Sequence, residues 1–261
     1  MIQVNNISHR YGSQPTLNDV SLYFEDEKLT GIIGANGAGK STLLAIVSRL
    51  ISANSGEVLL DGTNMKSLKN SDIAKKLAIL KQFNHINLKL TIRELVSLGR
   101  FPHSKGRLNQ QDQQKIDEAL KYMELGPIEN KYIDQLSGGQ KQRAFLAMVI
   151  AQDTKYVLLD EPLNNLDLRY ASEMMQILKA LVRDYKKTIL IVLHDINFAA
   201  AFCDQIVAMK DGNIIKDGDV KDVIAKDIID DVFNHDFKIA KVDNQNVIIY
   251  HQNKEGTENE K

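Results

Sequence analysis

The chain has 261 residues, 43% of them hydrophobic, with 33 Lys and Arg against 34 Asp and Glu. This length and composition predict a globular protein with a sizeable core, which excludes a disordered chain and a small stapled scaffold. The nearly balanced charge gives no reason to expect nonspecific attraction to nucleic acid or to anionic lipid.

The sequence contains no predicted membrane span. Its longest clear apolar run covers residues 144–151, far short of the roughly 18 residues that a spanning helix needs. The opening MIQVNNISHRYG lacks the basic patch and apolar stretch of a signal peptide, and Cys203, the one cysteine, lies in an apolar-rich stretch. We expect a cytoplasmic protein with a buried structural thiol, so any membrane role would require a partner.

Short apolar runs, rich in β-branched residues and bounded by polar or turn residues, predict buried strands over residues 29–33, 78–80, 156–159 and 188–193. Apolar residues at helical spacing predict helices over 41–50 and 174–181. Because strands alternate with helices, the pattern predicts an α/β fold with a parallel sheet.

The pattern changes between about residues 86 and 150, where strand-like runs disappear. Asn109 and Asp112 have the spacing of a capping box, and the predicted helix that follows has Ile116, Leu120 and Met123 on one face. We interpret this region as an inserted helical subdomain.

The C-terminal part predicts a strand over 213–216, short helices to about Phe233, and a hairpin that turns near 243–246. The predicted domains follow from these elements. They are a discontinuous core of 1–85 and 151–218, a helical subdomain of 86–150, C-terminal helices and hairpin of 219–252, and a disordered tail of 253–261.

A phosphate-binding loop is the most specific early motif. Residues 34–42 read GANGAGKST, which fits the pattern GxxxxGK[ST] and stands between a predicted strand and a predicted helix. In such a loop the glycines let backbone N–H groups face the phosphates at a helix N-terminus. Lys40 would reach the β and γ phosphates of a nucleoside triphosphate, and Ser41 would ligate Mg2+.

Two carboxylates at the end of a later strand are candidates for the second half of this site. Asp160 and Glu161 close the run YVLLDE, and neighbouring strand residues point to different sides. Asp160 is placed to hold Mg2+ through water, and Glu161 to reach a water that attacks the γ-phosphate. A helix cap in the turn DEPLNNLD is the structural alternative for either residue.

Residues 136–140 read LSGGQ, and with this sequence the chain resembles the nucleotide-binding subunits of ABC transporters. Ser137 can cap the following helix, Gln140 completes an S-x-x-Q box, and Gly138 and Gly139 leave N–H groups open to an anion. The resemblance covers about residues 1–250. It implies a P-loop NTPase core of the RecA-like type with a parallel sheet and an inserted helical subdomain, the ABC ATPase fold.

The resemblance also implies roles for residues that are weak signals singly. Tyr11 would stack on adenine, Gln82 would lie at the junction of sheet and helical subdomain, residues 165–167 would form the D-loop, and His194 would be the switch histidine. The expected catalytic residues are Glu161, His194, Lys40 and Gln82, and the expected Mg2+ ligands are Ser41, Gln82 and Asp160. The expected ATP contacts are Tyr11, Gly34, Asn36, Gly37, Ala38, Gly39, Lys40, Ser41, Thr42, Ser137, Gly138, Gly139, Gln140 and Asp167.

A narrower similarity concerns cargo. At Leu163-Asn164 the chain departs from many relatives, which have a small hydroxyl residue there, and this departure matches the narrower similarity. The stretches DEPLNNLD, GRFPHSKGRL and LHDINFA are similar to the ATPases of bacterial importers for iron-siderophore complexes. They lie outside the phosphate chemistry, so they indicate a subfamily by similarity only.

In the family that the chain resembles, two copies pack head to tail and ATP lies between the P-loop of one copy and the signature of the other. Because this chain has one set of motifs, the resemblance implies a homodimer. The implied partners are integral membrane permease subunits, a second copy of the chain and, indirectly, an extracellular substrate-binding lipoprotein, without nucleic acid. The implied place is the cytoplasmic face of the cell membrane.

Two other functions have to be weighed. A soluble ABC-type ATPase acting on ribosomes or DNA would carry two motif sets or a long coiled-coil insertion, whereas Leu136 follows Ser41 by only 95 positions. A small-molecule kinase shares the P-loop but has no use for LSGGQ. Neither needs a membrane partner, so co-purification with an integral membrane protein would distinguish them from a transporter subunit.

Overall fold

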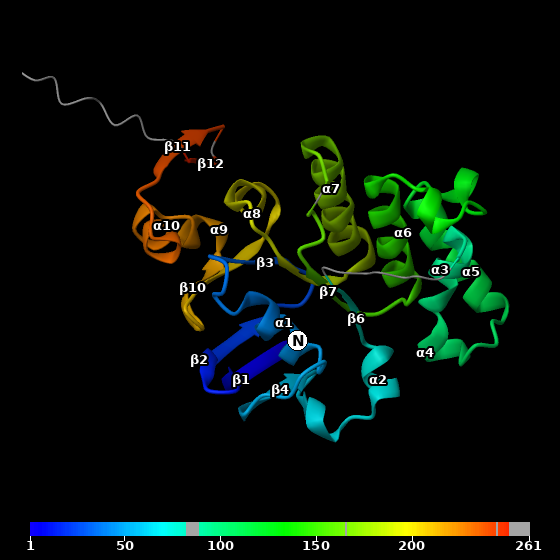
Figure 1. The fold of residues 1–261 in the computed structure, drawn as a ribbon, viewed down its shortest axis with the longest axis horizontal. Helices are drawn as coiled ribbons and strands as arrows, with labels where there is room; N and C mark the ends of the chain where they lie inside the picture. The colour runs from blue at the N-terminus through cyan, green and yellow to red at the C-terminus, as the bar shows by residue number, and fades with distance from the viewer. Residues whose placement is uncertain (82–88, 165, 244, 251–261) are drawn as a thin grey trace, which may run out of the picture.

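The computed structural model of the chain describes residues 1–81, 89–164, 166–243 and 245–250. Its centre is a sheet with the strand order β10-β9-β3-β8-β7-β6, whose strands are parallel except for the edge strand β10 (Figure 1). The strands are β3 (Leu29–Gly34), β6 (Leu77–Leu80), β7 (Tyr156–Asp160), β8 (Thr188–Val192), β9 (Gln205–Lys210) and β10 (Asn213–Asp219).

The predicted parallel α/β sheet is therefore confirmed. Every residue of β3 and β8 is buried, as expected for apolar strands covered on both faces of a sheet. The strand order places β3, β8 and β7 side by side, so their carboxyl ends share one edge of the sheet. This edge is where ligands bind in open α/β sheets.

A second, antiparallel sheet has the order β2-β1-β4-β5 and was not predicted from the sequence. Its strands are β1 (Ile2–Tyr11), β2 (Gln14–Phe24), β4 (Ser55–Leu60) and β5 (Thr63–Asn64). Its apolar residues share one buried cluster with helix α1 (Lys40–Val47) and with one face of the central sheet. Helix α1 and the loop before it are thus held against both sheets.

Helix α1 is shorter than the predicted 41–50. It ends at Val47 because Arg49 adopts a left-handed conformation with φ 59°, and its guanidinium donates hydrogen bonds to the carbonyl oxygens of Met65 and Leu68. Leu50, expected on the apolar face, is consequently exposed.

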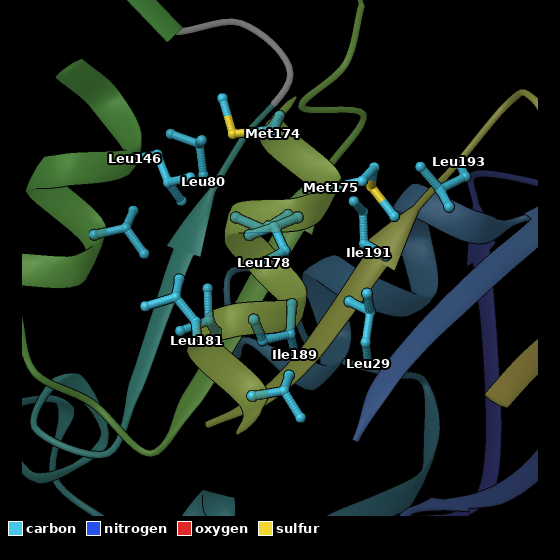
Figure 2. Packing of buried hydrophobic residues seen from close by; sticks show 14 of the residues in the cluster. Leu29, Leu80, Leu146, Met174, Met175, Leu178, Leu181, Ile189, Ile191 and Leu193 are labelled. Carbon is cyan, nitrogen blue, oxygen red and sulfur yellow. The ribbon is translucent and has the colours of Figure 1, made fainter. Parts of the chain in front are cut away.

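The opposite face of the central sheet is covered by α7 (Leu168–Tyr185) and α8 (Ile196–Phe202). Figure 2 shows Met174, Met175 and Leu178 of α7 packed on the apolar side chains of the sheet. The predicted helix 174–181 is the buried middle of α7, which extends further in both directions. Cys203 follows α8 and is buried as predicted, and this burial raises the pKa of its thiol to about 12.

The described part of the region 86–150 is helical, as predicted, and its only β pairing is a bridge between Thr91 and Tyr132. Asn109 and Asp112 form the predicted capping box, and Ile116, Leu120 and Met123 are buried. Helices α3, α5 and α6 pack together beside β6 (Figure 1). The helices here are α3 (Ile92–Leu98), α4 (Phe101–Ser104), α5 (Gln110–Tyr122) and α6 (Gly138–Ala151), and α2 (Asn70–Ala74) precedes β6.

The C-terminal part contains α9 (Val220–Val223), α10 (Lys226–Phe233) and a hairpin of β11 (Lys238–Val242) and β12 (Gln245–Ile249). The predicted short helices and hairpin are confirmed. The side-chain amide of Asn197 donates to the carbonyl oxygen of Ile248 at 3.0 Å and accepts from its N–H at 2.8 Å. This single side chain of α8 thus pairs with the hairpin backbone.

The predicted disordered tail, 253–261, lies outside the described residues. The domain boundaries stay predictions. Among the helices of the described residues, none combines the length and apolar composition of a bilayer-spanning segment.

Candidate nucleotide site

The loop between β3 and α1 is tightly packed at Gly34 and Gly39. Gly39 has φ 98° and caps α1, and a Cβ atom there would lie 2.7 Å from the carbonyl oxygen of Thr16. Gly34 has φ 151°, and a Cβ there would lie 2.2 Å from the carbonyl oxygen of Met209. Both positions therefore exclude larger residues for reasons of backbone conformation and of space.

Lys40, at the first turn of α1, is buried. Its Nζ donates to the carbonyl oxygens of Gly34 and Ala35, each at 2.9 Å, so the side chain folds back over its own loop. Burial lowers the pKa of the ammonium, and the carboxylates of Glu161 and Asp160 oppose that shift. The loop thus holds a cation close to the two carboxylates.

Other residues of the loop differ in exposure. Asn36, Gly37 and Ser41 are exposed, Thr42 is half-buried and Ala38 is buried. A Cβ at Gly37, where φ is 84°, would meet no atom within 4 Å. The exposed side of the loop can therefore accept a ligand at a helix N-terminus, where backbone N–H groups favour an anion.

Asp160 ends β7 and lies beside the loop. Ser41 Oγ donates to Asp160 Oδ1 at 2.8 Å. Burial raises the pKa of the Asp160 carboxyl, the Ser41 hydrogen bond opposes the rise, and the charge of Glu161 adds to it. The pair that the sequence placed 119 residues apart is thus in direct contact.

Glu161 follows Asp160 and is held by two side chains. Its Oε1 lies 2.6 Å from His194 Nε2, and its Oε2 accepts from Asn164 Nδ2 at 2.6 Å. Only 9% of the Glu161 side chain is exposed, against 39% for His194. His194 comes two residues after β8, which neighbours β7 in the sheet, and this adjacency brings the two predicted catalytic residues together.

Asn164 was not predicted as a site residue. Its spacing of three residues after Glu161, within a turn, is the signal that the sequence offered.

The LSGGQ segment lies at the start of α6. Ser137 Oγ accepts from the Gln140 N–H at 3.3 Å, and the Gln140 side chain accepts from the Ser137 N–H at 3.2 Å. This is the predicted capping box. Ser137, Gly138 and Gln140 are exposed, and a Cβ at Gly139 would come within 3.3 Å of the Tyr170 ring.

Asp167 and Tyr11 are the remaining predicted contacts that the structure describes. Asp167 caps α7, accepting from the Tyr170 N–H at 3.0 Å, and is exposed. Tyr11 is 58% exposed at the end of β1, with its ring set edge-on against His9 at a centroid distance of 4.7 Å. Gln82, expected both in catalysis and at the metal, and Asn165 of the expected D-loop lie outside the described residues.

A family model described as ABC transporter matches residues 17–164, more than half of the chain. The chain therefore belongs to the ABC transporter family, and within it to the ATP-hydrolysing subunits. It is 50% identical over 250 residues to the petrobactin import ATP-binding protein YclP of Bacillus subtilis (strain 168), an alignment that covers 96% of this chain and 99% of that protein.

Another relative, the iron(3+)-hydroxamate import ATP-binding protein FhuC of the same strain, is 41% identical, with 88% of this chain and 86% of that protein covered. Among solved structures, the dimeric structure of MJ0796, a bacterial ABC transporter cassette, superposes with a TM-score of 0.75 at 33% identity, covering 84% of this chain and 99% of that one. The expected family and fold are thus confirmed.

Proposed function

We propose that this chain is the ATP-hydrolysing subunit of an importer for a ferric siderophore complex, and that it works as a homodimer on a separate membrane permease. The observation that carries the proposal is the 50% identity to a petrobactin import ATP-binding protein over nearly the full length of both chains. The similarity to an iron(3+)-hydroxamate import ATP-binding protein supports the same cargo class.

The P-loop supplies the binding half of the proposed mechanism. The Lys40 ammonium would leave its two carbonyl partners to contact the β and γ phosphates, and the N–H groups of Gly37 to Thr42 would face them. Ser41 and Asp160 present oxygen donors of the kind that Mg2+ prefers, and their contact at 2.8 Å fits a shared ion. When bound, Mg2+ would offset the negative charge of the phosphates.

Glu161 and His194 supply the proposed chemistry. The Glu161 carboxylate orients or deprotonates the attacking water, and the His194 imidazole contacts the γ-phosphate. Their contact at 2.6 Å supports a joint role, because it places the imidazole directly beside the base that handles the water. Lys40 stabilises charge that develops on the transferred group.

The substitution Glu161→Gln tests this chemistry, because it keeps the side chain's shape and removes its charge. ATP affinity should stay near the wild-type value, while hydrolysis falls by about 10^2- to 10^4-fold. Asp160→Asn is the matched control, since losing a metal ligand should weaken Mg2+-dependent binding as well. Hydrolysis by Glu161→Gln near the wild-type rate would assign the water to another residue, with His194 the first candidate.

The exposed signature supports the proposed head-to-tail dimer. Ser137 and Gly139 would face the γ-phosphate held by Lys40 of the other copy, and the dimeric form of the MJ0796 cassette gives a precedent for self-association in this fold. ATP would hold the two copies together, hydrolysis would release them, and this closing and opening would move the permease.

The proposed partners are permease subunits docked on the helical subdomain near Gln82, a second copy of the chain and, through the permease, an extracellular substrate-binding lipoprotein. The proposed location is peripheral, on the cytoplasmic face of the cell membrane.

Uptake of radiolabelled iron tests the cargo. A strain that lacks this chain should lose uptake of iron bound to petrobactin and regain it with the wild-type chain but not with Glu161→Gln. Iron bound to a hydroxamate siderophore serves as the second substrate. Unchanged uptake of both complexes in the deletion strain would reject the proposed cargo class and leave the ATPase assignment intact.

A further inference from the structure

The turn after β7 brings the side chain of Asn164 back onto Glu161. The Asn164 N–H donates to the Glu161 carbonyl oxygen at 3.3 Å, closing a turn of four residues, and Glu161 itself has the left-handed φ of 52°. The Asn164 side-chain amide then donates to Glu161 Oε2 at 2.6 Å. The same turn therefore sets both the backbone and the carboxylate of Glu161.

Two partners of the Glu161 carboxylate, His194 and Asn164, differ in their attachment to it. His194 contacts Oε1 from a different strand end, and Asn164 contacts Oε2 from the same turn as Glu161. Glu161, Asn164 and His194 line one cavity of about 260 Å³. A rotation of His194 toward a γ-phosphate would not require the bond from Asn164 to break, because its donor and acceptor belong to the same turn of four residues.

We propose that Asn164 is a positioning residue that holds Glu161 Oε2, so that Oε1 faces the attacking water once His194 has turned to the phosphate. The proposal rests on the proposed role of Glu161 as the group that handles the water. An amide suits this task because its NH2 group donates a hydrogen bond without ionising. When a hydrogen bond holds one oxygen of a carboxylate, the group no longer rotates freely, so the second oxygen keeps its alignment.

Two variants at this position test the proposal. Asn164→Ala removes the donor, and Asn164→Asp keeps the size but replaces the donor with a second negative charge. Both should lower kcat, by about 10-fold for Asn164→Ala and by more for Asn164→Asp, with KM for ATP within twofold of wild type. Asn164 is exposed, so the melting temperature should hardly move.

Asn64→Ala is the matched control, because Asn64 Nδ2 makes the same kind of bond, 2.5 Å from Glu57 Oε2, in the antiparallel sheet. Its kcat should equal that of wild type. Wild-type kcat in both Asn164 variants, or a loss confined to KM, would overturn the positioning role.

A double-mutant cycle with Glu161→Gln, measured as single turnovers of labelled ATP, separates this inference from the function on which it rests. If Asn164 acts through the Glu161 carboxylate, Asn164→Ala should cause little further loss in the Glu161→Gln background. An equal loss in both backgrounds would overturn the inference and leave the role of Glu161 standing. A near-wild-type rate in Glu161→Gln alone would overturn both.

Discussion

The P-loop and the LSGGQ segment are both glycine-containing turns at a helix N-terminus, yet their surroundings differ. In the P-loop, Lys40 and Gly39 are buried, a Cβ atom at Gly39 would lie 2.7 Å from the carbonyl oxygen of Thr16 in β2, and Ser41 contacts Asp160 from a separate strand. In LSGGQ, the described side-chain hydrogen bonds of Ser137 and Gln140 join these two residues to each other, and both are exposed. The P-loop is therefore packed into the core of the chain. The LSGGQ turn makes its side-chain hydrogen bonds within itself and is exposed, as expected of a surface that binds another molecule.

The largest effect is expected from a substitution in the P-loop. Lys40→Ala removes the cation that the loop holds beside its phosphate site, so ATP affinity should fall by at least about 100-fold. Equilibrium titration with a fluorescent ATP analogue measures this. Lys221→Ala, which removes an exposed lysine side chain, is the control and should bind normally. Wild-type affinity in Lys40→Ala would show that the loop binds phosphate without its lysine.

A second prediction concerns the outward-facing turn. Ser137→Arg should leave ATP binding by a single chain intact, because the P-loop is complete without it, and should abolish turnover, because the bulky cation would fill the place of the γ-phosphate in a composite site. Steady-state ATPase assays measure turnover, and Ser71→Arg, an exposed serine on α2, should retain it.

Mixing Ser137→Arg with Lys40→Ala sharpens this comparison. A heterodimer of the two variants can rebuild one complete site from the Lys40 of one chain and the Ser137 of the other, so the mixture should recover activity that neither variant has alone. Heterodimers that form but remain inactive would contradict composite sites.

The smallest effect is expected at Tyr11, which belongs to neither turn. Stacking of its exposed ring on adenine should contribute about 1 kcal/mol, so Tyr11→Ala should weaken ATP binding by about fivefold and Tyr11→Phe should not. Tyr23→Ala is matched in exposure, at 56% against 58%, and should have no effect. Equal losses in Tyr11→Ala and Tyr11→Phe would argue for the hydroxyl rather than the ring.

Features that depend on local sequence were predicted well. Strands β3, β7 and β8 consist mainly of apolar residues and are buried except for Asp160 at the end of β7. The caps at Asn109 and Ser137 each depend on a partner three residues away. The antiparallel sheet was missed because β1 is interrupted by register shifts, for example between Val4 and Ile7, which break the alternation that marks a strand.

The candidate site was predictable in its parts but not in its contacts. The sequence marks Ser41, Asp160, Glu161 and His194 as candidates, but whether they touch depends on strand order, because β3, β8 and β7 are adjacent only in the folded sheet. The contact of Asn164 with Glu161 depends on the left-handed backbone at Glu161, which no residue preference at that position signals.

The pairing of Asn197 with Ile248 has a consequence for how such chains diverge. A strand added to a sheet shares its backbone ladder with the neighbouring strand, so its loss would leave a row of N–H and C=O groups unpaired. The C-terminal hairpin pairs its strands with each other and meets α8 through the amide of Asn197, the Tyr250 hydroxyl on Asp195 and the buried side chain of Ile248. A segment attached in this way can be exchanged or remodelled in evolution while the strand ladder of the ATPase sheet stays intact.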